Sequence, residues 1–127
     1  MAHILLLEPD DVLAEIYQNA LEFSGHSVSL CGNAQAAVHS IDSRRPDVII
    51  TELELAVHNG IEFLYELRSY REWQELPVIV LSHMRGVGGD AMRALVNELG
   101  ISTYHYKPMT RLADIIQSVD KILAPVS

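Results

Sequence analysis

The chain has one cysteine, few aromatic residues and no long apolar run. Because Cys31 has no second cysteine to pair with, a disulfide framework within the chain is excluded, and a reducing cytoplasm is the expected location. The longest apolar runs have the length of strands, far short of the ~20 residues that a membrane-spanning helix needs. Residues 1–8 carry no basic leader and reach an acid too soon for a signal peptide. We therefore expect a globular domain with no membrane partner.

Basic residues are scarce as well. Nine Lys and Arg stand against 17 Asp and Glu, which gives a formal net charge of −8. Such an excess of negative charge argues against nucleic-acid binding through a basic face. The 127 residues suit one domain, spanning 1–127 with a core expected at about 3–124, and 49% of them are hydrophobic. We expect a single packed domain whose partners are not nucleic acids.

Five short segments have the character of β-strands. Residues 4–7, 48–51 and 78–82 are almost wholly apolar, which is typical of strands buried on both faces of a sheet. Residues 27–31 alternate only weakly, which favours a strand at the edge, and residues 102–106 form the last strand.

Helical periodicity separates these strands, with apolar residues at three- and four-residue spacing. The side chains expected to face the core are Leu13, Ile16, Tyr17, Ala20 and Leu21; Ala37, Val38 and Ile41; Ile61, Leu64 and Leu67; Met92, Leu95, Val96 and Leu99; and Leu112, Ile115, Ile116, Val119, Ile122 and Leu123. A strand followed by a helix, five times over, predicts an α/β fold with a parallel sheet covered by helices on both faces.

In such a fold, ligands bind where the strands end at their carboxyl ends. The residues at those ends are Glu8, Glu52, Ser82 and Lys107. Carboxylates can hold Mg²⁺, whereas a hydroxyl and an ammonium can hold phosphoryl oxygens. Phosphoryl transfer to a carboxylate would use both kinds of group, with catalysis arising from positioning and charge neutralisation.

These residues make the chain similar, over essentially its whole length, to the receiver domain of two-component response regulators. The marks are the acidic segment 8–10, the acid Glu52 eight residues before Gly60, Ser82, and Tyr104 three residues before the Lys107-Pro108 pair. The resemblance implies a single-domain, flavodoxin-like (CheY-like) fold. It has a five-stranded parallel sheet in the order 2-1-3-4-5 and helices on both faces.

The resemblance also implies a role for each of these side chains. The position of Glu52 accepts phosphate from a histidine kinase, and the acids Glu8 and Asp10, with Glu52, are the candidates for binding Mg²⁺. Ser82 and Lys107 contact the phosphoryl group. Tyr104 is the aromatic residue that rotates inward when the switch is on. The Lys107–Pro108 bond is expected to be cis.

Several positions depart from the family pattern. Glu52 replaces the acceptor aspartate, Pro9 replaces the acid that binds metal most directly, and His83 replaces a small residue. Ala56 replaces a loop proline, and the glycine-rich loop 83–89 is longer than usual. A misplaced reacting group can cost about a hundredfold in rate per ~1 Å. We therefore expect a pseudo-receiver with a weak or absent Mg²⁺ site, no other cofactor and no usual phosphorylation cycle.

Other interpretations stay open at this point. The chain could be a phosphorylatable receiver with relaxed acceptor chemistry. A more distant alternative is a small flavodoxin-like protein that binds a nucleotide or flavin, which the acidic segment 8–11 disfavours because it would repel a phosphate. Glu52 could pair with Lys107 and Ser82 and hold an active-like state, or the pair could be purely structural. Tyr104 could be ordinary strand packing.

The expected function is that of a signalling module in a phosphorelay, not an enzyme. Its partners would be signalling proteins, such as a histidine kinase or a downstream effector. By resemblance, residues 92–99 and 104–114 form the face that carries partner contacts and a possible homodimer.

Overall fold

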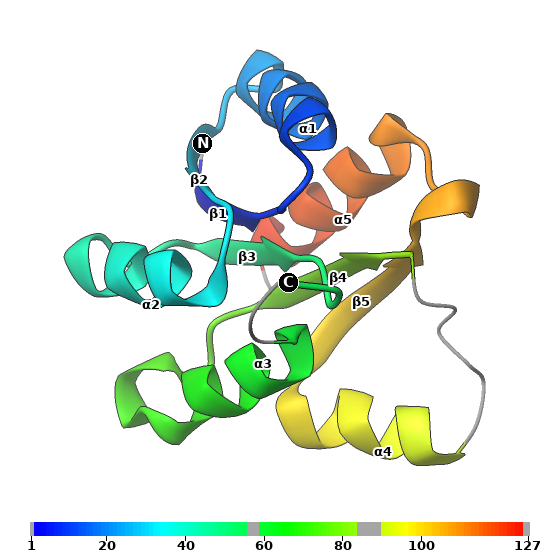
Figure 1. Ribbon diagram of the computed structural model, residues 1–127. Helices are drawn as coiled ribbons and strands as arrows, with labels where there is room; N and C mark the ends of the chain where they lie inside the picture. The colour runs from blue at the N-terminus through cyan, green and yellow to red at the C-terminus, as the bar shows by residue number, and fades with distance from the viewer. Residues whose placement is uncertain (1, 56–58, 84–89, 126–127) are drawn as a thin grey trace.

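The computed structural model describes residues 2–55, 59–83 and 90–125, with only the backbone described for residues 90–92 (Figure 1). Its five strands are β1 (His3–Leu7), β2 (Ser27–Cys31), β3 (Val48–Thr51), β4 (Val78–Ser82) and β5 (Ile101–Tyr106). All neighbouring strands pair in parallel, in the order β2-β1-β3-β4-β5. The predicted fold class and strand order are confirmed.

Five helices cover the sheet: α1 (Asp11–Phe23), α2 (Ala34–Ser43), α3 (Gly60–Ser69), α4 (Asp90–Leu99) and α5 (Leu112–Leu123). Two short 3-10 turns, η1 (Arg71–Trp73) and η2 (Lys107–Met109), follow α3 and β5. Helices α1 and α5 lie on one face of the sheet, and α2, α3 and α4 lie on the other (Figure 1).

The alternation of side chains along β1 explains why residues 4–7 of this strand are all apolar. Leu5 and Leu7 pack with α2 and α3, whereas Ile4 and Leu6 pack with α1 and α5. Every residue of β1, β3 and β4 is buried, as expected of inner strands of a sheet covered on both faces. β2, at the edge, is buried only at Cys31.

Polar side chains begin three of the helices. The Asp10 carboxylate accepts hydrogen bonds from the Val12 and Leu13 amides, both at 3.0 Å. Asn33 and Asn59 cap α2 and α3 in the same way, each at 2.8 Å. Such a cap stabilises a helix by about 1 kcal/mol because it satisfies amides that have no partner within the helix.

Several local expectations were wrong. The Lys107–Pro108 bond is trans, because no cis bond occurs in the described residues; Pro108 lies in the first turn of η2, where its fixed φ is favourable. Ile16 is 43% exposed, because the buried stripe of α1 runs through Ala14, Tyr17 and Leu21. β5 begins at Ile101, one residue before the predicted start of this strand.

The remaining corrections concern core residues. Leu112 and Leu123, at the ends of α5, are exposed because that helix buries only its centre, at Ile115 and Val119. The side chain of Met92 and the position of Ala56 lie outside the described residues, as does most of the glycine-rich loop. No helix in the described part of the chain is long and apolar enough to span a membrane.

Gly60 allows the start of α3 to approach the end of β3. A Cβ atom at this position would lie 2.6 Å from both the Glu52 carbonyl oxygen and the Leu53 Cα atom. We expect Gly60→Ala to lower the free energy of unfolding by about 1–3 kcal/mol, because two backbone segments must move apart. Gly32→Ala is the matched control, since a Cβ there meets nothing within 4 Å. Urea denaturation checks this, and equal losses in both variants would contradict it.

Candidate functional site

Four strands deliver one polar side chain each to the carboxyl edge of the sheet. Glu8 follows β1, Glu52 follows β3, Ser82 ends β4 and Lys107 follows β5. The backbone continues the ladder at both acids, because the Glu8 amide donates to the Cys31 carbonyl and the Glu52 amide donates to the Leu7 carbonyl, each at 3.0 Å. The structure thus brings together the four residues that the sequence placed at this edge.

The Lys107 ammonium lies between the two carboxylates. Its Nζ atom is 2.6 Å from Glu8 Oε1 and 2.8 Å from Glu52 Oε1. All three side chains are almost fully buried, at 5% exposure for Lys107 and 2% for each acid. A buried carboxylate needs a charged or hydrogen-bonding partner, so one ammonium serves two acids here.

The remaining carboxylate oxygens accept main-chain hydrogen bonds. Glu52 Oε2 accepts from the amides of Leu53 at 2.6 Å and Glu54 at 3.0 Å. Glu8 Oε2 accepts from the Asp10 amide at 3.1 Å. The extra methylene of glutamate lets Glu52 fold back on its own loop, so every carboxylate oxygen of the pair is engaged.

His83 lies at the mouth of this site. Its amide donates to Glu52 Oε1 at 3.3 Å, and its half-exposed ring places Nδ1 3.4 Å from the same oxygen. The amides of Leu53, Glu54 and His83 are functional groups that sequence reasoning missed. Because every non-proline residue carries such an amide, no signal in the sequence singles these out.

Hydrogen bonding sets the ionisation of the central pair. Burial alone would raise the pKa of Glu52, but hydrogen bonds from Lys107, Ser82 and the Glu54 amide lower it below its usual value. Burial would lower the pKa of Lys107, yet its bonds to Glu52 and Glu8 raise it. Both groups are therefore held in their charged forms.

These opposite shifts predict a pH dependence. The contribution of Glu52 is present above the unfolded carboxyl pKa of about 4.3 and is lost as the pH falls through the lower folded pKa. The contribution of Lys107 to stability is present below the unfolded lysine pKa of about 10.4 and is lost as the pH rises through its higher folded pKa. We expect Glu52→Gln to flatten part of the acid limb of stability against pH in chemical denaturation. An unchanged acid limb would contradict this assignment.

Tyr104 reaches the same site from β5. Burial raises the pKa of its hydroxyl, and a hydrogen bond with Ser82 partly offsets that effect. The ring is partly buried against the core between the sheet and α2, α3 and α4. Tyr104 thus points toward the site, in contact with a residue that also bonds Glu52.

The donor set does not fit Mg²⁺. This ion demands near-octahedral oxygen coordination. Asp10 Oδ1 accepts the cap hydrogen bonds of α1, and Pro9 has no side-chain oxygen. The oxygens of Glu8 and Glu52 that face the cleft hold the Lys107 ammonium. Among the described residues, no group of three His, Cys, Asp or Glu is arranged to bind a metal.

Comparison with known proteins agrees with the fold. The response regulator receiver domain matches residues 4–120. The KDP operon transcriptional regulatory protein KdpE of Escherichia coli is 34% identical over 108 residues, covering 85% of this chain and 45% of that protein. The probable transcriptional regulatory protein TcrX of Mycobacterium tuberculosis is 26% identical over 140 residues, covering 92% and 59%. The chain thus spans about half the length of these relatives.

Solved structures show the same fold. The chemotaxis protein CheY4 of Vibrio cholerae has a TM-score of 0.85 at 18% identity, covering 96% of this chain and 98% of that one. The non-phosphorylated HemR receiver domain of Leptospira biflexa has a TM-score of 0.83 at 21% identity, covering 100% and 98%. With the match over residues 4–120, these likenesses identify the chain: it belongs to the response regulator receiver domain family.

Proposed function

We propose that this chain is a pseudo-receiver, which signals through protein contacts and does not run the usual cycle of phosphorylation. One observation carries the proposal: the Lys107 ammonium is shared by Glu8 and Glu52 at 2.6 and 2.8 Å. In the family, the equivalent positions serve a metal ion and a phosphoryl group. Here a side chain of the protein itself supplies the positive charge between the acids.

The position of the acceptor carboxylate supports this view. Glu52 Oε2 is held by the Leu53 and Glu54 amides, and Oε1 is held by Lys107 and the His83 amide. An oxygen must leave such bonds before it can attack a phosphorus atom in line. In-line transfer tolerates misplacement poorly, at about a hundredfold in rate per ~1 Å.

The same contacts suggest what Glu52 does in place of accepting phosphate. Its carboxylate bonds Lys107 and Ser82, the groups that would contact a phosphoryl group in the family. Ser82 in turn bonds the inward-facing Tyr104. We infer that Glu52 stands in for the phosphoryl group and holds the domain in one, active-like state.

The partners of such a domain are signalling proteins, either a histidine kinase or an effector. The face formed by residues 92–99 and 104–114 is the proposed contact surface, also for a homodimer. Exposed apolar side chains on it support this assignment, with Met109 at 79% and Leu112 at 41% exposure. We propose that the domain is not itself an enzyme and that its output passes through a partner or a further domain.

A receiver that still accepts phosphate is the second candidate function, favoured by the convergence of Glu52, Ser82 and Lys107. Beryllofluoride with Mg²⁺, a mimic of the bound phosphoryl group, separates the two. We expect the NMR amide signals of Leu53, Glu54 and His83 to stay in place. Both oxygens of Glu52 already accept hydrogen bonds, so neither is available to bind the beryllium atom of beryllofluoride. Saturable shifts of these signals would support the second candidate and overturn the first.

A further inference from the structure

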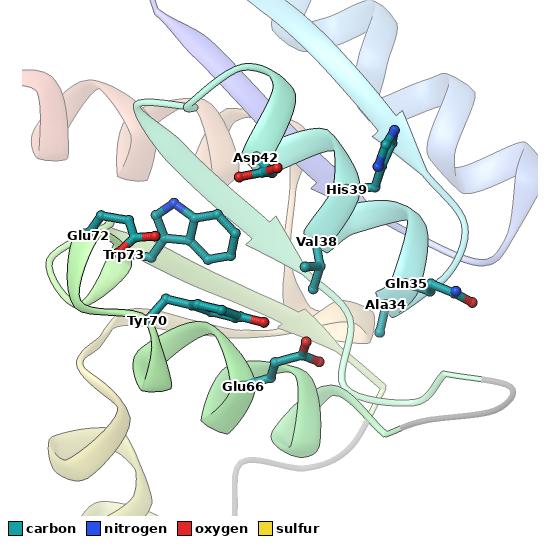
Figure 2. Close-up of a pocket in the computed structure, with 9 residues that line it drawn as sticks. All are labelled: Ala34, Gln35, Val38, His39, Asp42, Glu66, Tyr70, Glu72 and Trp73. Carbon is teal, nitrogen blue, oxygen red and sulfur yellow. The ribbon is translucent and has the colours of Figure 1, made fainter.

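A cavity of about 650 Å³ lies between α2 and α3 and extends to η1 (Figure 2). Figure 2 shows Val38 and Asp42 on α2, Glu66 on α3, and Trp73 in η1 around it. A second hollow of about 210 Å³ shares Ala34 and Glu66 with it, so the groove continues along the two helices. None of the residues that line the two hollows belongs to the site at Glu52.

Two aromatic rings form one end of this cavity. The ring centroids of Tyr70 and Trp73 lie 4.7 Å apart, with the planes tilted by 56°. Trp73 is 6% exposed and fixed in the core, whereas Tyr70 is 39% exposed. The cavity thus has a rigid aromatic wall, against which a planar or cationic group can stack.

Three carboxylates, those of Asp42, Glu66 and Glu72, surround the aromatic wall, and no Lys or Arg lines the cavity. Within residues 2–55, 59–83 and 90–125, none of these carboxylates has a hydrogen-bond or ion-pair partner. Arg45 contacts the same segment, but its Nη1 atom donates to the main-chain carbonyl of Glu72 and leaves the carboxylate free. The lining therefore holds three carboxylates and no Lys or Arg to pair with them.

We propose that this cavity binds an arginine side chain presented by a protein partner. A guanidinium stacks on aromatic faces and donates hydrogen bonds to carboxylates from a planar fork, which matches Tyr70, Trp73 and the acids around them. The apolar Ala34 and Val38 suit the methylene stem of arginine.

The shape of the groove selects a peptide over a free amine. A single arginine side chain fills the cavity but leaves the adjoining hollow empty, whereas a peptide segment can occupy both the cavity and the hollow. The net charge of −8 would also speed the approach of a basic partner. This contact is separate from the Glu52 site and goes beyond the proposed signalling function, whose partner surface lies at residues 92–99 and 104–114 and shares no residue with the cavity.

Trp73 makes the test direct, because it is the one tryptophan in the chain and its fluorescence reports on this cavity. The 127-residue chain is titrated with the blocked peptide acetyl-Gly-Arg-Gly-amide, and with the same peptide carrying citrulline, which keeps the shape of arginine without its charge. We expect saturable binding of the arginine peptide with a Kd on the order of 1 mM, and binding of the citrulline peptide about tenfold weaker. Equal binding of both peptides, or no saturable change, would overturn the proposal.

Variants assign the binding to the cavity. The double variant Asp42→Asn, Glu66→Gln should bind the arginine peptide about tenfold more weakly, because two charge-assisted contacts are removed. Glu15→Gln, an exposed acid on α1, is the matched control and should change nothing. An unchanged Kd in the double variant would overturn the site. Free arginine amide binding as tightly as the peptide would overturn the assignment to a protein partner.

Discussion

Replacing Lys107 with methionine is expected to lower the free energy of unfolding by about 3–5 kcal/mol at neutral pH. The substitution keeps an unbranched chain of similar length but removes the ammonium that Glu8 and Glu52 share. Two buried carboxylates would then lie close together without a cation. Because a domain of this size is stable by roughly 5–15 kcal/mol in total, the loss is a large fraction of its stability.

Urea denaturation of the wild type and Lys107→Met measures this loss. Lys121→Met, at an exposed position of α5, is the control and should stay within about 0.5 kcal/mol of the wild type. The loss should shrink as the pH falls, because removing the Lys107 ammonium takes away the main contact that lowers the pKa of Glu52, so that this buried acid can protonate. A loss below about 1 kcal/mol at neutral pH would mean that the ion pair is not a structural element of the site.

A triple replacement tests whether the charges or the volume matter. Glu8→Gln and Glu52→Gln, combined with Lys107→Met, remove all three charges while keeping similar side-chain sizes. Buried ion clusters replaced in this way are often neutral or even more stable. We expect the triple variant to recover much of the stability that Lys107→Met alone loses. Such a recovery would show that the cluster is retained for a function.

The second large expected effect concerns phosphorylation. Glu52→Asp combined with Pro9→Asp restores the short acceptor and the missing acid of the family pattern. A better-placed acceptor carboxylate should raise the rate of transfer by about a hundredfold or more. The double variant should therefore gain a phosphoryl group from acetyl phosphate in the presence of Mg²⁺, where the wild type does not. Glu52→Asp alone should give a smaller gain, since the metal would still lack a ligand.

The sequence predicted the sheet well because burial on both faces leaves an unmistakable apolar run, as in 78–82. It also predicted which residues meet at the carboxyl edge, because parallel strands all end there. The sequence and the family resemblance left open that Glu52 pairs with Lys107, and the distance of 2.8 Å agrees with that interpretation.

The details that the sequence did not predict depend on which of several nearby groups a residue contacts in the folded chain. Asp10 was a candidate for the metal site, but its carboxylate caps α1. The trans bond at Pro108 follows from the turn of η2, which sequence alone does not reveal. The cavity beside Trp73 requires α2, α3 and η1 to be placed in space, and no periodicity in the sequence encodes that arrangement.

In the proposed pseudo-receiver, Glu52 and Lys107 occupy the site where a phosphoryl group would otherwise be bound. The most direct measurement incubates the wild-type chain with acetyl phosphate and Mg²⁺ and records its intact mass, with the variant carrying both Glu52→Asp and Pro9→Asp run in parallel to show that the reagent works. We expect the mass of the wild type to stay unchanged while the variant gains one phosphoryl group. A stable phosphoryl adduct on Glu52 of the wild type would contradict it.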